Sequence, residues 1–374
     1  MEKYFATVAR GLEELAADEL RQLGAKSVKP GFCGVEFQGN RTLLYKVNLW
    51  ARLPFRILQR LGQFQCRDAD DLYKGIQKIG WSDYLTPDYS LAVTATGKNK
   101  KLNHSHFTAL QVKNAVVDQQ RDEFGSRSFV DAKNPDVRIN VFINRDRCVV
   151  SLDSSGQSLH RRGYRPAVGA APLKESLAAA LIQMSDWTPE ETFFDPLCGS
   201  GTLPLEASLQ SLNLAPGLMR EQFGFETWMD FDAELWQGLI ADAEDKEKST
   251  VLAPIQGSDR NFQVVEQAKT NARQCGVEQW VTFETRELAD IEAPTDSGVI
   301  FCNPPYGERL GNDAELGEFY RLLGNVLKQR FKGWVAYVLS GNKKLSQTIG
   351  LRSSKRYSVY NGSLPCQLMK YELF

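Results

Sequence analysis

Residues 1–62 alternate hydrophobic and polar positions in the pattern of a small α/β domain. Apolar residues recur at helical spacing from Leu12 to Leu23, and Gly24 is suited to end that helix. A second helical pattern runs from Leu43 to Trp50. Short β-rich runs lie at residues 4–8, 35–37 and 55–58. This β-α-β-β-α-β-like order predicts a ferredoxin-like domain over residues 1–62.

Residues 63–155 show a second α/β pattern. We expect a strand at 91–95, a helix over 107–120 and further strands at 137–143 and 148–152. The segment between the first strand and the helix is basic and contains Lys98, Lys100, Lys101 and His104. A phosphate at such a junction meets cationic side chains and free helix amides, so these four residues are candidate RNA contacts. A solvated loop explains the lysine cluster equally well.

Residues 156–172 have the composition of a linker. They contain the run His160-Arg161-Arg162-Gly163-Tyr164-Arg165. Cationic side chains beside a tyrosine favour either a nucleic-acid contact or a latch between domains. Arg161, Arg162 and Arg165 are therefore added to the candidate RNA contacts.

Strands and helices alternate in residues 173–374. Apolar β runs at 193–194, 254–257, 281–283, 299–301 and 334–339 are interleaved with helical patterns at 173–181, 204–211, 262–275 and 316–327. This alternation predicts a Rossmann-like, doubly wound parallel sheet that binds its ligand at the carboxyl ends of the strands. The runs at 357–360 and 368–373 predict a hairpin-like edge of that sheet. We interpret residues 213–248 as an insertion near the site.

Composition limits the class of protein. A chain of 374 residues with 42% hydrophobic and 24% charged residues fits two or three globular domains. No apolar run approaches the ~20 residues of a membrane span, and charged residues interrupt the N-terminus early. The seven cysteines are scattered without a Cys-x-x-Cys pair, which argues against a zinc site or a disulfide framework. We therefore expect a cytoplasmic protein with no membrane contact and no metal.

The net charge of −1 conceals an asymmetry along the chain. Residues 1–165 contain 26 Lys and Arg against 18 Asp and Glu, whereas the remainder contains 19 against 28. A basic part joined to an acidic part is typical of a protein in which one region holds a polyanion. Uneven surface decoration is the alternative explanation.

A glycine-rich loop, Asp195-Pro-Leu-Cys-Gly-Ser-Gly-Thr202, follows an expected strand and precedes an expected helix. Glycines let the backbone approach a ligand closely. The carboxylate of Asp195 would repel a pyrophosphate but suits the ammonium group of S-adenosylmethionine. We therefore predict that Asp195, Cys198, Gly199, Gly201 and Thr202 form a cofactor loop, although a plain tight turn has the same pattern.

The ends of the next two strands supply further candidate cofactor contacts. Asp259, with Arg260 beside it, can accept both hydroxyls of a ribose. Glu287 and Leu288 can contact adenine through a carboxylate and a backbone amide. Asp290 is a rival for that role, and each of these acids can also be simply solvated.

The most specific element is Asn303-Pro304-Pro305-Tyr306, directly after a buried strand. Two prolines fix the backbone and hold Asn303 extended, so its amide oxygen and the Pro304 carbonyl can point at one amino group. Two such acceptors favour the geometry in which the amine lone pair points at a methyl donor. Tyr306 offers an aromatic face for the base. These four residues are the predicted catalytic loop, and Asn303 also borders the cofactor.

The two motifs Asp195-Pro-Leu-Cys-Gly-Ser-Gly-Thr202 and Asn303-Pro-Pro-Tyr-Gly-Glu-Arg309 resemble those of THUMP-containing RNA methyltransferases. Leu159-His-Arg-Arg-Gly-Tyr-Arg165 and Ala171-Pro-Leu-Lys-Glu-Ser176 make the RlmL-type 23S rRNA guanine-N2 methyltransferases the most similar group. The resemblance covers nearly the whole chain. It implies a THUMP RNA-binding domain at 63–155 and a class I methyltransferase domain with a seven-stranded sheet at 173–374. It also implies S-adenosylmethionine as cofactor and a guanine amine of rRNA as acceptor.

The same resemblance assigns roles by motif. Asp195, Gly199 and Gly201 line the cofactor, Asp259 holds its ribose, Glu287 its adenine, and residues 303–306 hold the target base. Enterobacterial relatives carry a second methyltransferase domain, whereas this chain ends after the first. We therefore expect a stand-alone form, for which a tRNA guanine is also an open substrate.

Two further hypotheses remain open. The Asn-Pro-Pro-Tyr loop is shared by enzymes that methylate the adenine amine in DNA, although the basic N-terminal part favours RNA. A protein of another class, a non-catalytic RNA-binding scaffold, would need neither the cofactor loop nor the catalytic loop.

Overall fold

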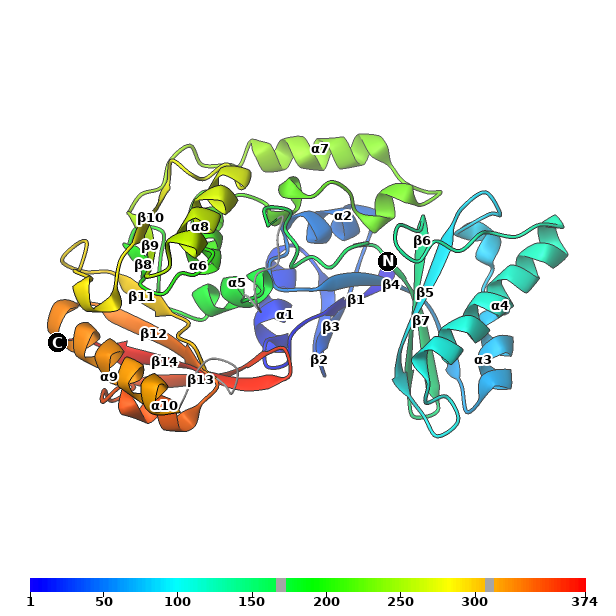
Figure 1. Cartoon of the computed structure of the whole chain (residues 1–374). Coiled ribbons are helices and arrows are strands. Elements are labelled where there is room, and N and C mark those ends of the chain that lie inside the picture. The colour runs from blue at the N-terminus through cyan, green and yellow to red at the C-terminus, as the bar shows by residue number, and fades with distance from the viewer. Residues whose placement is uncertain (166–172, 307–312) are drawn as a thin grey trace. The chain divides into compact units, whose positions relative to one another are not determined.

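The computed structural model describes residues 1–165, 173–306 and 313–374, and the chain forms two compact units (Figure 1). The first unit comprises Met1–Val8, Ala16–Leu159 and Arg220–Ile240. The second comprises Ala9–Leu15, His160–Met219 and Ala241–Phe374. Each contains one seven-stranded sheet.

The sheet of the first unit has the strand order β2-β3-β1-β4-β7-β6-β5. Its N-terminal elements are β1 (Glu2–Thr7), α1 (Glu13–Gln22), β2 (Lys26–Gly31), β3 (Gly34–Gly39), α2 (Arg41–Trp50) and β4 (Arg56–Gln65). Asn40 caps α2 by accepting a hydrogen bond from the backbone N–H of Leu43 at 3.0 Å. Only β2 was not predicted, because it is a polar strand containing Pro30, a composition that an edge position tolerates.

The rest of this sheet comes from residues 66–153. Its elements are α3 (Ala69–Ile76), β5 (Leu91–Lys98), α4 (Ser105–Phe124), β6 (Val137–Asn144) and β7 (Arg147–Asp153). Strand β4 pairs with β1 on one edge and with β7 on the other, so the two α/β patterns share one strand. The expected boundary between residues 62 and 63 lies inside β4.

The middle of the insertion packs within the first unit. The ring of Phe225 stacks on Tyr45 of α2 with centroids 4.3 Å apart. The Tyr45 hydroxyl accepts a hydrogen bond from the N–H of Asp232 at 3.0 Å, and Thr227 donates to the carbonyl of Asp136 at 2.5 Å. Aromatic burial against α2 gives residues 220–240 a structural role within the first unit. The position of the insertion near the site stays a prediction.

The sheet of the second unit has the order β10-β9-β8-β11-β12-β14-β13. Strands β8 (Phe193–Asp195), β9 (Ile255–Asp259), β10 (Val281–Thr285), β11 (Val299–Cys302) and β12 (Val335–Ser340) run parallel, and β14 (Leu364–Glu372) and β13 (Lys355–Asn361) form an antiparallel hairpin at one edge. This confirms the predicted doubly wound sheet with a hairpin edge. The helices are α5 (Glu175–Gln183), α6 (Thr202–Ser211), α7 (Ala233–Glu244, whose first part belongs to the first unit), α8 (Phe262–Gln274), α9 (Asp313–Arg330) and α10 (Lys343–Thr348).

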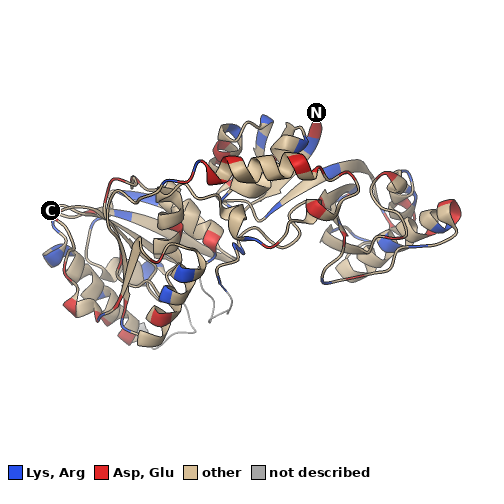
Figure 2. Cartoon of the chain, turned by 90° about the horizontal axis from the view of Figure 1, so that it is seen from above, with Lys and Arg blue, Asp and Glu red and all other residues tan. Residues whose placement is uncertain are grey.

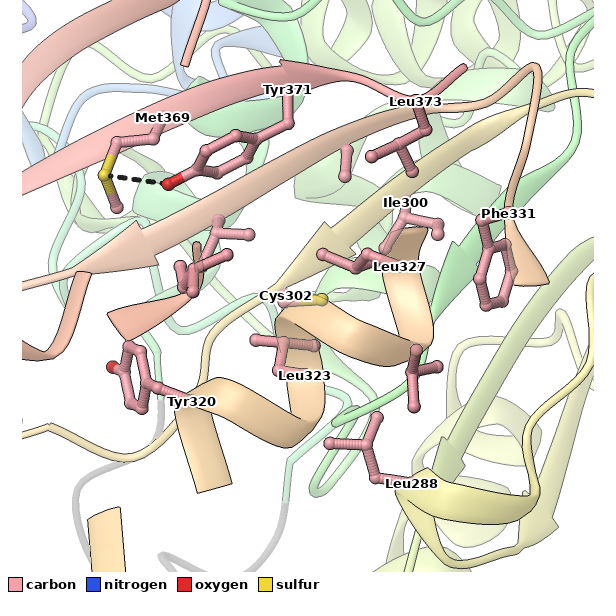
Figure 3. Close-up of a cluster of buried hydrophobic side chains, with 14 of the residues drawn as sticks. Leu288, Ile300, Cys302, Tyr320, Leu323, Leu327, Phe331, Met369, Tyr371 and Leu373 are labelled. Carbon is pink, nitrogen blue, oxygen red and sulfur yellow. Dashed lines mark hydrogen bonds between the residues drawn. The ribbon is translucent and has the colours of Figure 1, made fainter. Parts of the chain in front are cut away.

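A dense apolar core lies between α9 and the sheet (Figure 3). All four residues of β11 are buried, as expected of a central parallel strand. Figure 3 shows Tyr320, Leu323 and Leu327 of α9 in one cluster with Ile300 and Cys302 of β11. Met369 and Tyr371 of β14, and Leu373 just after it, belong to the same cluster. The hydroxyl of Tyr371 donates to the sulfur of Met369 at 3.4 Å within this core. The core fixes β11, and therefore the start of the loop that follows it.

The part of the predicted linker that the structure describes, residues 156–165, is packed. Leu159 is buried and its N–H donates to the carbonyl of Phe55 at 2.8 Å. Tyr164 is also buried. The remaining linker residues, 166–172, lie outside the described residues. Among the helices that are described, none is long and apolar enough to cross a membrane.

Candidate functional site

The order of the second sheet brings the two sequence motifs together. Strands β8 and β11 are neighbours, although more than a hundred residues separate them in the chain. Asp195 ends β8 and Asn303 follows the end of β11. The chain crosses from one side of the sheet to the other between these strands. Ligands of open α/β sheets bind at such a switch point.

Strand β9 holds the glycine-rich loop in place. The N–H of Cys198 donates to the carbonyl of Ser258 at 2.9 Å, and the N–H of Gly199 donates to Oδ2 of Asp259 at 3.1 Å. The other oxygen of Asp259 accepts from the N–H of Asn261 at 2.9 Å. Because a carboxylate has about four acceptor positions, Asp259 retains capacity for two hydroxyls.

The two glycines of the loop serve different purposes. Gly199 has φ +52°, and a Cβ added there would meet no atom within 4 Å, so its surroundings are open enough for a ligand. Gly201 has φ +85°, and a Cβ there would lie 2.8 Å from the ring of Phe283 and 3.1 Å from Ala268. Its lack of a side chain therefore allows the loop to pack on β10 and α8.

The carboxyl group of Asp195 is buried in this loop. Burial raises its pKa to about 8, and the negative charge of Asp259 adds to the shift. The N–H of Leu197, which donates to Oδ1 at 3.0 Å, opposes it. A buried acid with a raised pKa is stabilised as an anion when a cationic group binds beside it. This electrostatic setting fits an ammonium group and disfavours a phosphate.

The other predicted cofactor residues differ in exposure. Glu287 is exposed, whereas Leu288 is buried in the core below the sheet. The N–H of Arg286 donates to the carbonyl of Asp259 at 3.0 Å, which places the end of β10 beside the end of β9. Arg260 is exposed. Thr202 is buried, and its hydroxyl accepts a hydrogen bond from Arg165.

The loop after β11 presents one unsatisfied acceptor. Asn303 Oδ1 is buried and accepts no hydrogen bond within the described parts of the chain. Pro304 is buried, and Pro305 and Tyr306 are half-buried. Residues 307–309 of the motif lie outside the described residues. A buried amide oxygen without a donor costs free energy, and an N–H group of a bound substrate can recover it.

Tyr306 is held by the antiparallel hairpin. Its hydroxyl accepts a hydrogen bond from Nδ2 of Asn361 at 3.1 Å and contacts Sγ of Cys366 at 3.8 Å. Burial raises the pKa of this phenol. A Cβ on Gly341 would lie 3.0 Å from the Tyr306 ring, so the ring packs against the backbone after β12. The sequence did not reveal these partners, because they come from strands 55 and 60 residues further along the chain.

The same hairpin also contacts residues 9–15. The guanidinium of Arg10 lies 4.7 Å from the centroid of the Tyr360 ring. A Cβ on Gly11, which has φ +88°, would lie 3.1 Å from the carbonyl of Ser358. Tyr360 directly precedes Asn361. The turn between β1 and α1 therefore packs on the strand that holds Tyr306.

For two arginines the predicted RNA contact is wrong. Arg162 is 1% exposed, and its Nε lies 3.4 Å from the buried carboxylate of Glu206, which also accepts from the Tyr164 hydroxyl at 3.3 Å. Arg165 is 11% exposed and contacts Glu175 and Thr202. Both guanidinium groups are directed into the second unit, because buried carboxylates there require paired cations.

The other predicted RNA contacts are accessible. Lys98, Lys100, Lys101, His104 and Arg161 are exposed. Lys101 pairs with Asp68 at 3.0 Å, and His104 caps α4 by accepting from the N–H of Phe107 at 3.3 Å. Their binding of RNA remains a prediction.

The thiols beside the two motifs are structural. Cys198 and Cys302 are buried, and burial raises the pKa of each. They are small buried side chains and are unsuited to act as nucleophiles. In the described ranges, no group of three or more His, Cys, Asp or Glu side chains is placed to bind a metal ion.

Three protein families match the chain. Residues 162–370 match the RMKL-like methyltransferase domain, residues 66–153 the THUMP domain, and residues 3–58 the RlmL ferredoxin-like domain. Together they cover most of both units. The combination agrees with the predicted fold class.

Individual relatives are similar over the whole chain. The "Putative RNA methyltransferase slr0064" of Synechocystis is 56% identical over 99% of this chain and 97% of its own length. The ribosomal RNA large subunit methyltransferase K/L of Syntrophotalea carbinolica is 42% identical over 99% of this chain. This chain spans only 53% of that relative's length.

A solved structure agrees with the fold. The crystal structure of SMU.472, a "putative methyltransferase" complexed with SAH, superimposes with a TM-score of 0.90. It is 31% identical and covers 100% of this chain and 98% of its own. With a family match over more than half of its residues and full-length relatives above 30% identity, this chain belongs to the RMKL-like methyltransferases, with THUMP and RlmL ferredoxin-like domains preceding the methyltransferase domain.

Proposed function

We propose that this protein transfers a methyl group from S-adenosylmethionine to the exocyclic amine of a guanine in large-subunit ribosomal RNA. The observation that carries the proposal is Oδ1 of Asn303, which is buried without a hydrogen-bond donor from the described residues, at the strand end beside Asp195. It is a hydrogen-bond acceptor placed next to a loop suited to a cationic cofactor. The bound SAH of SMU.472 supports the choice of cofactor.

The chemistry requires positioning more than acid–base catalysis. S-adenosylmethionine supplies an electrophilic methyl group on a sulfonium. A base amine is a poor nucleophile because its lone pair is delocalised into the ring. Hydrogen bonds from that amine to Asn303 Oδ1 and to the Pro304 carbonyl would favour the tetrahedral geometry that frees the lone pair. The proton can leave after transfer, so no strong base is needed.

We assign the cofactor contacts as follows. Asp195 would accept from the ammonium group, Asp259 from the ribose hydroxyls, and Glu287 from the adenine amine. Gly199 gives the cofactor room to approach the backbone. The anchored ring of Tyr306 would stack on the target base.

RNA as substrate is supported by the THUMP match and by the names of the relatives. We infer that residues 1–62 and 63–155 together bind it, and that the enzyme acts in the cytoplasm. The choice of guanine as the base and of rRNA as the substrate rests on the resemblance to RlmL-type enzymes. The loop itself accepts any planar base amine, and one similar structure, 31% identical, bears the name of a "predicted N6-adenine-specific DNA methylase".

Labelled methyl transfer decides among these substrates. The purified protein and labelled S-adenosylmethionine are incubated with total RNA or DNA from a strain lacking the gene, and modified nucleosides are mapped by mass spectrometry. We expect N2-methylguanosine in 23S rRNA. N2-methylguanosine in tRNA, N6-methyladenine in DNA, or no transfer would each contradict the proposal in a distinguishable way.

A further inference from the structure

Part of one face of the strands from residues 56–153 is exposed in the described chain. Further along the same face, Ser151 and Asp153 of β7 are buried. Figure 1 shows α3 and α4 on the same side of β5, β6 and β7. The side chains that point toward these helices, such as Val141 and Ile143 of β6, are buried. Alternate side chains point away, and Phe142 is 45% exposed among them.

The register places this phenylalanine in a row of four side chains. Gln63 of β4 pairs with Val149 of β7, which pairs with Phe142 of β6, which pairs with Thr96 of β5. Two residues further along the strands lies a second row with the members Gln65, Arg147, Asn144 and Lys98. Because residues two apart on a strand are separated by about 6.6 Å, the row that contains Phe142 lies beside the row that contains Lys98 and Arg147.

The charged side chains of the two rows are all basic. Charges of both signs are interspersed along the elements of the chain, so net balance does not locate a polyanion site (Figure 2). The two rows contain Lys98 and Arg147 and no carboxylate. Asp146 lies in the turn between β6 and β7, outside both rows.

We propose that this face binds a single-stranded segment of RNA, with one base stacked on Phe142 and neighbouring phosphates held by Lys98 and Arg147. This rests on the proposed function, because it deepens the assignment of RNA as substrate. Base-on-aromatic stacking beside cationic side chains is how open sheets bind unpaired nucleotides. The bases of a duplex are already stacked on each other and cannot use the ring. Gln63, Thr96 and Asn144 offer polar groups to base edges at the margins.

The stacking role is tested on the full chain with a fluorescently labelled single-stranded RNA of about 12 nucleotides. Fluorescence anisotropy should show about 5- to 100-fold weaker binding for Phe142→Ala and for Phe142→Leu, and near-normal binding for Phe142→Tyr. Phe124→Ala is the matched control, since Phe124 is 41% exposed at the opposite end of α4 from His104. Unchanged affinity of both Phe142 variants, or an equal loss in the control, overturns the proposal. If the Phe142→Ala protein does not fold, Phe142→Leu still tests the role of the aromatic ring, because it keeps an apolar side chain at this position.

The phosphate contacts have a separate signature. For single strands, each lost phosphate contact lowers the slope of log K against log salt by about 0.7. The double variant Lys98→Gln/Arg147→Gln should therefore reduce the slope by about 1.4. Lys133→Gln/Arg127→Gln is the control and should leave the slope unchanged, because these two cations are also exposed but lie between α4 and β6, outside both rows. An unchanged slope in the first variant contradicts the proposal.

Failure of this inference and failure of the proposed function are distinguishable. If the unaltered protein binds and methylates RNA while all Phe142 variants behave normally, only the RNA-binding role of this exposed part of the sheet is misassigned. If the unaltered protein methylates no RNA, the proposed function itself fails.

Discussion

At the scale of single residues, the site contains two buried polar groups whose burial costs free energy when no ligand is bound. The Asn303 amide oxygen is buried without a donor in the described chain, and the Asp195 carboxyl is buried with a raised pKa. Each cost is relieved by a different ligand group, an N–H donor for Asn303 and a cation for Asp195. Such locally unfavourable positions are typical of functional sites.

Replacing Asn303 should separate catalysis from cofactor binding. In Asn303→Ala we expect methyl transfer to fall by about 100-fold or more, because one of two oriented acceptors is lost. The affinity for SAH, measured by calorimetry, should stay within about threefold of normal. Asp259→Asn is the opposite control, since its main effect should be a lower affinity for SAH. Lost SAH affinity in Asn303→Ala would mean that the loop holds the cofactor and not the base.

Replacing Asp195 should change the pH dependence of stability. The folded chain keeps a proton on Asp195 up to about pH 8, whereas an unfolded carboxyl near 3.8 releases it earlier. The free energy of unfolding should therefore fall as pH rises from about 4 to 8, and level off above. In Asp195→Asn this contribution disappears, so the variant should gain a few degrees in Tm at pH 8.5 relative to the unaltered chain.

Thermal melts of both proteins at pH 5 and pH 8.5 check this sign. The advantage of Asp195→Asn should be smaller at pH 5, and the variant should bind SAH more weakly. Equal differences at both pH values would show that Asp195 titrates normally.

At the scale of elements, the hairpin β13–β14 acts as a support for the catalytic loop. Asn361 donates to the Tyr306 hydroxyl, and Arg10 and Gly11 of the β1–α1 turn pack on the neighbouring residues Tyr360 and Ser358. Two segments from opposite ends of the chain therefore position one tyrosine.

Removing the hydrogen bond between Asn361 and Tyr306 should lower turnover without changing the affinity for the cofactor. A hydrogen bond of about 1 kcal/mol corresponds to a roughly fivefold change, so Asn361→Ala should reduce kcat by about 3- to 10-fold. SAH affinity should be unchanged. Tyr306→Phe should have a similar effect, and the double variant should be no worse than either single one. Additive losses in the double variant would show that Asn361 and Tyr306 act independently. Lys355→Ala, on the same strand as Asn361, is the control and should leave kcat unchanged.

At the scale of the whole molecule, the ferredoxin-like and THUMP regions form one sheet. Leu58 and Gln59 of β4 pair with Phe5 and Tyr4 on one side and with β7 on the other. A buried network also joins them, in which Asn48 of α2 hydrogen-bonds the Ser154 and Ser155 hydroxyls at 2.9 and 2.7 Å. A sheet with a shared central strand should open as one unit.

Native-state hydrogen exchange measures this cooperativity. Peptides covering β1, β4 and β7 should show the same free energy of opening across a urea series. If β5–β7 exchanged at a clearly lower free energy than β1–β3, the two regions would be independent domains and the shared strand would matter little.

Much of the fold was predictable because its signals are local. The five parallel strands, α8 and the edge hairpin followed from apolar runs and spacing, and the capped helix α2 from its apolar face. Strand β2 was not predicted from the sequence, because an edge strand needs no alternation of apolar and polar residues. Arg162 and Arg165 were misassigned because sequence shows a cation but not the buried carboxylates of Glu206 and Glu175 that pair with it.

The sequence by itself determined the order of strands and helices, the glycine-rich loop and the proline-fixed Asn303, since each depends on neighbours in the chain. Only the tertiary structure decided which strand ends meet, because Asp195 and Asn303 become adjacent through pairing of β8 with β11. It also decided that residues 220–240 pack on α2, that Asn361 holds Tyr306, and that Phe142 stays exposed. These outcomes depend on contacts between distant segments, and their free energies are not encoded in any local pattern.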